Sequence, residues 1–437
     1  MQIGQRLAAY FEFERLKTNW RTEILAGFTT FLTMAYIIFV NPAILKDAGI
    51  PVPAATIATC FSAAFGSLLM GAVARYPIAL APGMGLNAYF TYAVVKGMGV
   101  SWQVALGAVF LSGLAFLLMT VLGLRQMILN ALPTDLYAAV AAGIGLFIAF
   151  IGLKNAGIVV ANPATLVALG NLRQATAALA ILGLLIMGVL LARGSNLAIL
   201  VGIAAVSVIA FVSGLSQLAP STEGLSAITA TAFQLDIAGA LKIGLVEIIF
   251  VFLFVDLFDN LGTLVGVAKK AGLLDQGNRI PRVERILLTD SLATMFGSLL
   301  GTSTVVSYIE SASGVAAGGR SGVTAIVTGL LFLAAAVLAP FLGAIPTGAT
   351  APALILVGSL MVSHVSEINW RDPLVAIPAF LTLVCIPLTF SIANGLALGF
   401  IAYAALRLFS GRGHEVNWLV YVLAALFVVR FVYLGGE

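Results

Sequence analysis

The chain has 437 residues, of which 61% are hydrophobic and 9% are charged. An ordinary soluble domain carries about 25% charged residues, so this composition provides too few charges to cover the surface of a soluble protein. The net charge of +4 comes from basic residues in short segments between apolar runs, which gives no nucleic-acid-binding surface. The composition therefore excludes a soluble globular protein and predicts one that crosses the membrane many times.

Residues 1–23 carry acidic and basic side chains without the apolar run and cleavage site of a signal peptide, so we expect a cytoplasmic N-terminal segment. Cys60 and Cys385 lie far apart in apolar runs, and His364 and His414 lie in predicted loops. This distribution predicts no disulfide framework, no metal site and no cofactor.

Long charge-free runs follow one another along the chain, and a transmembrane helix needs roughly 20 apolar residues. Runs of about that length or more lie at 24–45, 48–74, 76–95, 97–124, 136–153, 174–192, 194–222, 291–309, 321–366 and 373–406. The run 321–366 is long enough for two spans, and 373–406, which contains Pro387, holds either one broken span or two short ones. With 240–266 and 417–434 added, we expect about fourteen helical spans.

The positions of the basic residues predict the orientation of these spans. With the N-terminus in the cytoplasm, most lysines and arginines fall in inner loops, as the positive-inside rule requires. The densest basic stretch, 269–285, divides the chain into halves of seven spans, so the second half is inserted upside down relative to the first. We expect a first repeat at 24–214, an extracytoplasmic connection at 215–239 and a second repeat at 240–434.

Two of the runs contain residues that interrupt a regular helix. In the third span Pro77 and Pro82 each remove a backbone donor, and in the tenth span 301–314 is rich in serine, threonine and glycine. Prolines can also merely kink a helix, and small residues can merely allow close packing. Because the two segments lie in matching positions of the two halves, we expect broken third and tenth spans whose half-helices begin near the middle of the membrane.

Four acidic residues fall inside predicted spans: Glu247, Asp256 and Asp259 in the eighth and Glu310 in the tenth. A charge at the bilayer centre costs on the order of 3 kcal/mol, and no lysine or arginine lies at a comparable depth in these segments. Loss of water favours the uncharged carboxyl group, so each acid is a candidate proton carrier as well as a hydrogen-bonding group. Glu247 lies nearer the outer end and is expected to be an interface anchor.

Asp256, Asp259 and Thr263 have the spacing i, i+3, i+7 and share one helix face, which must look into the protein rather than into lipid. A hydrogen bond between helices would explain a buried acid without any role in transport. We therefore expect one of Asp256 and Asp259 to be structural and the other functional. Glu310, beside the predicted chain break, is expected to be functional.

Several segments together resemble one family of transporters over nearly the whole chain. They are 26–42 in the first span, 81–89 (APGMGLNAY), 256–263 (DLFDNLGT) and 301–320, which includes Tyr308-Ile309-Glu310-Ser311. These segments resemble the nucleobase–cation symporters of the azaguanine-resistance (AzgA-like) branch, within the nucleobase/ascorbate transporter superfamily. The resemblance implies a fourteen-span, 7+7 inverted repeat with a core domain near 24–124 and 240–340 and a gate domain near 134–214 and 348–434.

The resemblance also implies which residues bind the substrate. The family's eighth-span acid falls on Asp259, its tenth-span acid on Glu310 and its third-span polar residue on Asn87, while Tyr308 takes the position of an aromatic packed against the base. Thr263 shares the face of Asp259. The family imports purine bases with protons, so Glu310, Asp259 or Asp256 would carry the coupled proton.

A purine base fits this set of side chains chemically. A carboxylate accepts two parallel N–H bonds, such as those from N1–H and the 2-amino group of guanine, and aromatic rings cover the flat face of a base. We therefore expect a proton-coupled permease of the inner membrane, not an enzyme, that imports guanine or hypoxanthine and also accepts adenine.

Other functions remain open from the sequence alone. A uracil or xanthine permease of the same fold is the nearest alternative, followed by an anion transporter, which Glu310 disfavours, and a passive channel. A polytopic enzyme would need a nucleophile and base or metal ligands at depth, and none is found. The expected partners are a purine base, the proton and the lipid bilayer, with monomer and homodimer both open.

Overall fold

The computed structural model describes residues 2–123, 133–216, 224–242, 246–274, 280–339 and 345–433. In these segments seven helices are long and apolar enough to cross a membrane. They span Trp20–Lys46, Val52–Ala74, Trp102–Val121, Thr134–Asn155, Ala175–Ala192, Thr347–Glu367 and Ile392–Phe409. Shorter apolar helices lie at Ala198–Val212, Ile248–Leu257, Gly322–Ala335, Pro373–Leu388 and Trp418–Val432. The chain is therefore a multi-pass helical membrane protein.

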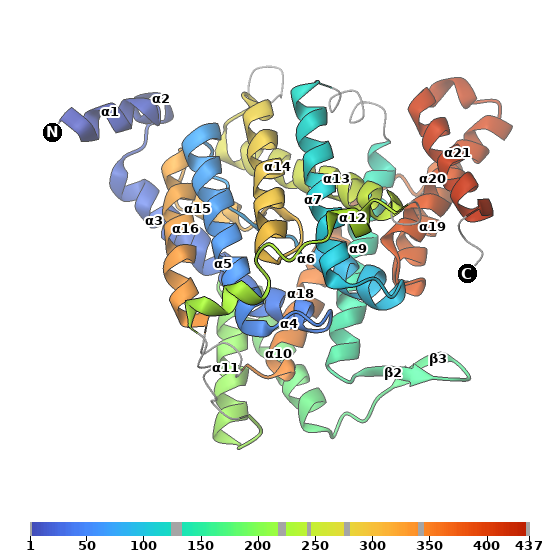
Figure 1. Cartoon of the computed structure of the whole chain (residues 1–437), viewed down its shortest axis with the longest axis horizontal. Helices are drawn as coiled ribbons and strands as arrows, with labels where there is room; N and C mark the ends of the chain where they lie inside the picture. Colours follow the sequence, from blue (N-terminus) through green and yellow to red (C-terminus); the bar gives the residue numbers. More distant parts are fainter. Residues whose placement is uncertain are drawn as a thin grey trace.

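One set of helices, here named the first helix group, combines segments from both halves of the chain. Figure 1 shows α5, α14, α16 and α7 side by side, and these helices pack closely on one another. The group consists of α3 (Trp20–Met34), α4 (Ile37–Lys46), α5 (Val52–Leu69), α7 (Trp102–Val121), α13 (Val246–Ala271), α14 (Val283–Leu300), α15 (Ser311–Ala316) and α16 (Gly322–Ala335). Their apolar residues form a core shared between the halves.

The remaining long helices form the second helix group, also drawn from both halves. It consists of α9 (Thr134–Asn155), α10 (Ala175–Ala192), α11 (Ala198–Val212), α18 (Thr347–Val362), α19 (Pro373–Leu388), α20 (Ile392–Phe409) and α21 (Trp418–Tyr433). Helices α9 and α18 pack along each other, α10 and α11 pack on α18, and α19 and α20 pack on α9. This exchange of partners between the halves is the packing pattern of an inverted repeat.

The run 373–406, which the sequence left as one broken span or two short ones, forms two helices. Helix α19 ends at Leu388 and α20 begins at Ile392, and the two helices pack against each other as a hairpin. Phe390 in the turn has a φ of 51°, in the left-handed region that favours glycine.

Two short buried strands, one from each half of the chain, pair with each other inside the first helix group, and this pair is called the crossing of β1 and β4 below. Strand β1 (Leu80–Pro82) pairs antiparallel with β4 (Val305–Ser307), with Leu80 opposite Ser307 and Pro82 opposite Val305. The pairing extends at both ends, because the Tyr308 amide donates to the Ala79 carbonyl at 3.0 Å and the Gly83 amide donates to the Thr304 carbonyl at 2.9 Å. The short helices α6 (Met84–Ala88) and α15 follow the two strands.

Each strand is fixed by a hydroxyl group from the helix that precedes it in its own half. Ser67 Oγ of α5 accepts from the Leu80 amide at 2.9 Å and donates to the Leu80 carbonyl at 3.1 Å. Thr294 Oγ1 of α14 accepts from the Val305 amide at 3.1 Å and donates to the Val305 carbonyl at 3.0 Å. The hydroxyls satisfy backbone groups that would otherwise be buried without a partner.

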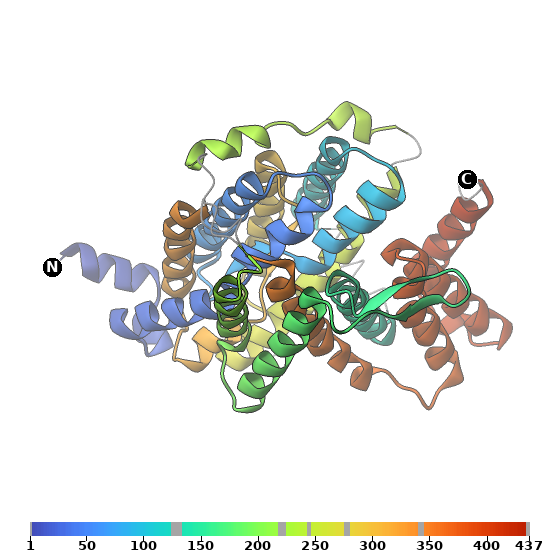
Figure 2. The same ribbon diagram turned by 90° about the horizontal axis from the view of Figure 1, so that it is seen from below.

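The N-terminal segment, the connection before α13 and the hairpin after α9 lie on the surface. Figure 2 shows the connection that holds α12 (Ile237–Ala240) running along the outside of the bundle, and Figure 1 shows the hairpin of β2 (Val159–Asn162) and β3 (Leu166–Leu169) projecting from the bundle. At the N-terminus, α1 (Gln2–Tyr10) and α2 (Phe13–Leu16) flank Glu12. Its carboxylate pairs with Arg15, Arg75 and Arg282, so the N-terminal segment is tied to loops of both halves.

Candidate functional site

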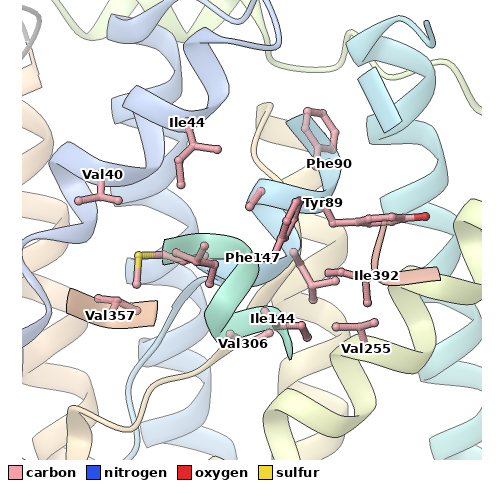
Figure 3. Packing of buried hydrophobic residues seen from close by; sticks show 14 of the residues in the cluster. Val40, Ile44, Tyr89, Phe90, Ile144, Phe147, Val255, Val306, Val357 and Ile392 are labelled. Atoms are coloured by element: carbon pink, nitrogen blue, oxygen red, sulfur yellow. The ribbon is translucent and has the colours of Figure 1, made fainter. Parts of the chain in front are cut away.

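A cavity of about 460 Å³ lies between the two helix groups, beside the crossing of β1 and β4. The second group contributes Tyr137, Val140, Ala141 and Ile144 of α9 and Val357, Leu360 and Met361 of α18. The first group contributes Tyr36, Gly83, Met84, Gly85, Val255, Thr263 and the stretch 306–310. Figure 3 shows how closely the two groups approach, with Ile144 of α9 near Val306 of β4 and Val255 of α13. The lining is mostly apolar, with few polar groups, as is usual for a small-molecule site.

Glu310 is the acidic side chain in this lining within the described residues. It is half-buried, and it directly precedes the short helix α15. The Tyr36 hydroxyl donates to Glu310 Oε1 at 2.5 Å. A carboxylate at this position presents acceptors to the cavity, so it can receive the N–H groups of a ligand.

Tyr308 also lines the cavity, two residues before Glu310. Its hydroxyl donates to the Pro82 carbonyl at 2.5 Å, which fixes the ring across the two crossing strands. The ring is 6% exposed, so its orientation is set by packing as well as by this bond. The structure thus brings Tyr308, Glu310 and Thr263 to one cavity.

The acidic residues of α13, in contrast to Glu310, are not seen in the cavity lining within the described residues. Thr263 lines the cavity, whereas Asp256 is buried at 1% exposure and does not belong to the lining. The side chains of Asp259 and Glu247 lie outside the described residues, although both positions belong to α13. Asp259 is one helical turn before Thr263 in this helix.

Asn87, which the sequence predicts to contact the substrate, is not among the residues that line the cavity. Its side-chain amide donates to Asn41 Oδ1 of α4. The Asn41 amide in turn donates to Thr59 at 2.8 Å and to Thr302 at 3.0 Å. Asn87 therefore belongs to a buried polar network that joins α4, α5, α6 and the segment before β4.

Two polar residues near the site, Tyr36 and Asp290, were missed by the sequence reasoning. Tyr36 was hidden in an apolar run, and nothing in its spacing marked it as a partner of Glu310. Asp290 lies at the edge of the predicted run 291–309, close to charged loop residues, but the structure buries it completely in α14. It accepts from the Asn260 amide at 2.5 Å, and Asn260 Oδ1 accepts from the Ser307 amide at 2.9 Å.

Glu23 was assigned to the N-terminal segment but is also fully buried. Its carboxylate accepts from the Arg320 amide at 2.9 Å and from the Thr324 hydroxyl at 2.6 Å, at the start of α16. This is a capping role, because the first amides of a helix have no partner within the helix.

At the opposite end of the interface, a chain of hydrogen bonds joins the two helix groups. The Tyr92 hydroxyl donates to Asp47 Oδ2 at 2.6 Å, and the Asn155 amide at the end of α9 donates to the Tyr92 oxygen at 3.0 Å. Asp47 and Asn155 also line a smaller cavity of about 180 Å³ between α4 and α18. The larger cavity instead extends to Ser363 and His364, beyond the other end of α18.

Within the described residues no cluster of three or more histidine, cysteine or acidic side chains has the arrangement of a metal site. The arrangement that the structure does offer is a cavity between two helix groups, next to two extended segments that cross at the centre of an inverted repeat. Such an arrangement defines a membrane transporter rather than a soluble binding protein.

Solved transporters share this fold. The structure of SLC26A9 matches with a TM-score of 0.65 over 94% of this chain and 69% of that chain, at 13% identity. The transmembrane domain of the cyanobacterial bicarbonate transporter BicA matches with a TM-score of 0.61 over 87% of this chain and 98% of that chain, at 15% identity. At these identities the likeness concerns the fold alone.

The sequence matches the profile described as "Permease family" over residues 21–398. The chain therefore belongs to this family, the nucleobase/ascorbate transporters, and is a permease rather than an enzyme. It is 45% identical over 441 residues to the guanine/hypoxanthine permease PbuG of Bacillus subtilis, covering 98% of this chain and 100% of that protein. It is 44% identical over 431 residues to the adenine permease AdeP of Escherichia coli, covering 99% and 97%.

Proposed function

We propose that this permease imports purine nucleobases in symport with protons across the inner membrane, with guanine and hypoxanthine preferred and adenine accepted. The observation that carries the proposal is Glu310, a carboxylate that projects into an otherwise largely apolar cavity beside the ring of Tyr308. Full-length relatives that carry guanine, hypoxanthine or adenine in their names support the same substrate class.

The cavity offers complementary surfaces to the two parts of a purine. The ionised Glu310 accepts N–H groups from the polar edge of the base, and each polar group of the base must be matched once its water is removed. Tyr308 and aliphatic side chains such as Ile144 and Val357 cover its flat faces. Adenine lacks the adjacent N–H pair of guanine and would bind a protonated acid instead.

Asp259 and Thr263 complete the proposed polar shell from α13, because one helical turn separates their positions. Glu310 or Asp259 takes up the coupled proton, and Asp256 tunes its neighbour or braces α13. Asn87 supports α6 through Asn41 instead of contacting the base.

Transport follows from the movement of one helix group against the other around the bound base. We assign the first helix group to the core domain and the second to the gate domain of a fourteen-span 7+7 repeat with broken third and tenth spans. With the N-terminus in the cytoplasm, α9 begins and α18 ends at the inner side. The larger cavity lies beside these helix ends and opens toward the cytoplasm, while the hydrogen bonds that link Asp47, Tyr92 and Asn155 close the outer side.

The experiment is uptake of labelled hypoxanthine and guanine by cells that lack their own purine permeases. Glu310→Ala should abolish uptake, whereas Glu367→Ala, which removes an exposed acid outside the cavity, should leave it unchanged. A protonophore should also abolish uptake. Wild-type uptake rates in the Glu310→Ala variant would refute the assignment, and uptake that survives the protonophore would refute proton coupling.

A competition panel of unlabelled bases decides the preference. Guanine and hypoxanthine should compete with labelled hypoxanthine more strongly than adenine, and uracil and xanthine should compete weakly. Competition by bicarbonate or another small anion would favour an anion carrier. We do not expect it, because a carboxylate in the cavity repels an anion.

A further inference from the structure

The side chain of Tyr36 reaches the cavity from the joint between two helices of the first helix group. Helix α3 ends at Met34 and α4 begins at Ile37, so Tyr36 lies between two helical segments of one span. It is 1% exposed and lines the cavity. Its hydroxyl donates to Glu310 Oε1 at 2.5 Å, across a sequence separation of 274 residues. The bond therefore ties the cavity acid to the opposite half of the chain.

The chemistry of this pair makes Tyr36 more than a packing residue. A phenol has one proton to donate, and an ionised carboxylate only accepts. A hydrogen bond to the ionised carboxylate favours that form over the protonated one. When Glu310 binds a proton or receives the N–H of a base, the Tyr36 hydroxyl competes for the same oxygens.

The other titratable groups that line the cavity, within the described part of the chain, are Tyr137, Tyr308 and His364. The Tyr308 hydroxyl donates to the Pro82 carbonyl, and the His364 ring contacts Glu367 at 2.9 Å near the mouth. Helix α13 packs against α15 and carries Asp256, which is buried outside the lining. The hydrogen bond from the Tyr36 hydroxyl reaches Glu310 from the first half of the chain.

We propose that Tyr36 is a positioning residue that holds Glu310 in its ionised form in the empty cavity and thereby sets the pH range of proton uptake. The inference deepens the proposed function and rests on it for its physiological meaning. The hydrogen bond itself is a property of the empty permease and is tested without any substrate.

The test is an infrared pH titration of the purified full-length permease in lipid. The carboxylic-acid C=O signal of Glu310 is identified by its loss in Glu310→Gln, and its amplitude is followed with pH. In Tyr36→Phe the midpoint should rise by about one pH unit, which corresponds to the loss of one hydrogen bond to a charged group. Tyr76→Phe is the matched control, because it removes another buried hydroxyl, one that donates to the Pro281 carbonyl, and its midpoint should equal that of the wild type.

An unchanged or lower midpoint in Tyr36→Phe overturns the proposal, and so does the absence of a titrating Glu310 signal in the wild type. If Tyr36→Phe does not fold, Tyr36→Met removes the hydroxyl and fills the space with a flexible side chain. The pH of half-maximal hypoxanthine uptake should move in the same direction as the midpoint. Failure of the proposed function has a different signature, namely no purine uptake by the wild type at any pH.

Discussion

The crossing of β1 and β4 depends on Thr294, and replacing this residue by valine should weaken it. The ladder bonds join residue 308 to 79 and residue 83 to 304, so Pro82 and Val305 form a non-hydrogen-bonded pair of the antiparallel ladder, and the Val305 amide and carbonyl point away from β1. Thr294 Oγ1 bonds both of these outward-facing groups, because it donates to the Val305 carbonyl at 3.0 Å and accepts from the Val305 amide at 3.1 Å. Valine has the same shape as threonine without the hydroxyl.

The expected magnitude follows from the two backbone groups that would lose their partner. A buried polar group left without a hydrogen bond costs about 1–3 kcal/mol, so the loss of partners for two groups in Thr294→Val should destabilise the crossing by about 2–6 kcal/mol. The crossing carries Tyr308 and precedes Glu310, so the loss should also disturb the cavity.

The assay combines thermal unfolding of the purified permease with uptake of labelled hypoxanthine. Thr294→Val should lower both the melting temperature and the uptake rate. Thr294→Ser keeps the hydroxyl and should retain most of both. Ser67→Ala removes the corresponding hydroxyl in the first half, at Leu80, and should have an effect of similar size.

Two outcomes would refute this reasoning. Wild-type stability and uptake in Thr294→Val would show that the hydroxyl does not support the strand. A larger loss in Thr294→Ser, which lacks the methyl group, than in Thr294→Val, which keeps it, would show that packing is what matters at this position.

Three further predictions concern other parts of the molecule. Burial opposes ionisation of Glu12, but its paired arginines hold the pKa of this carboxyl below its usual value of 4.5. Glu12→Gln should therefore lower the melting temperature at neutral pH, and the difference from the wild type should disappear as the pH falls through the folded-state pKa. A Cβ on Gly145 would lie 2.7 Å from the Gly358 carbonyl oxygen, so Gly145→Ala should separate α9 from α18 and cost about 1–3 kcal/mol in thermal unfolding, whereas unchanged stability would show that the helices can slide apart freely. Asp47→Ala removes the acceptor of the Tyr92 hydroxyl and should open the outer side. The measurement uses a chain without native cysteines that carries one cysteine in the smaller cavity, and an impermeant thiol reagent added from outside should label this cysteine faster in Asp47→Ala. Equal labelling with and without the substitution would contradict a closing role for the contact.

Much of the architecture follows from the sequence because its causes are local. Apolar runs with few charges can be stable only as helices in lipid, since every backbone group must be bonded within the segment. Pro77 lies between the preceding helix and β1, Pro82 is the last residue of β1, and the effect of a proline on the backbone acts within a turn. The prominence of Glu310 also follows from a local fact, the cost of placing its charge in an apolar run.

Partners across the fold could not be found in this way. Helical periodicity predicts that Asp256 and Thr263 share a face, yet Thr263 lines the cavity and Asp256 is buried outside its lining. One face of a helix contacts several neighbouring helices, and the positions of those helices decide which of its residues line the cavity and which pack in the interior. The same limit explains Asn87, whose polar character was evident but whose partner, Asn41, belongs to another span.

The amino-acid sequence by itself determined that this is a polytopic helical permease with acidic groups at membrane depth, because hydropathy and backbone chemistry act on neighbouring residues. Only the tertiary structure decided that Tyr36 bonds Glu310, that Asp290 holds Asn260 beside β4, and that the cavity lies between helices from both halves. These contacts join residues that are far apart in the chain. Their geometry is fixed by the packing of whole helices, which no short stretch of sequence specifies.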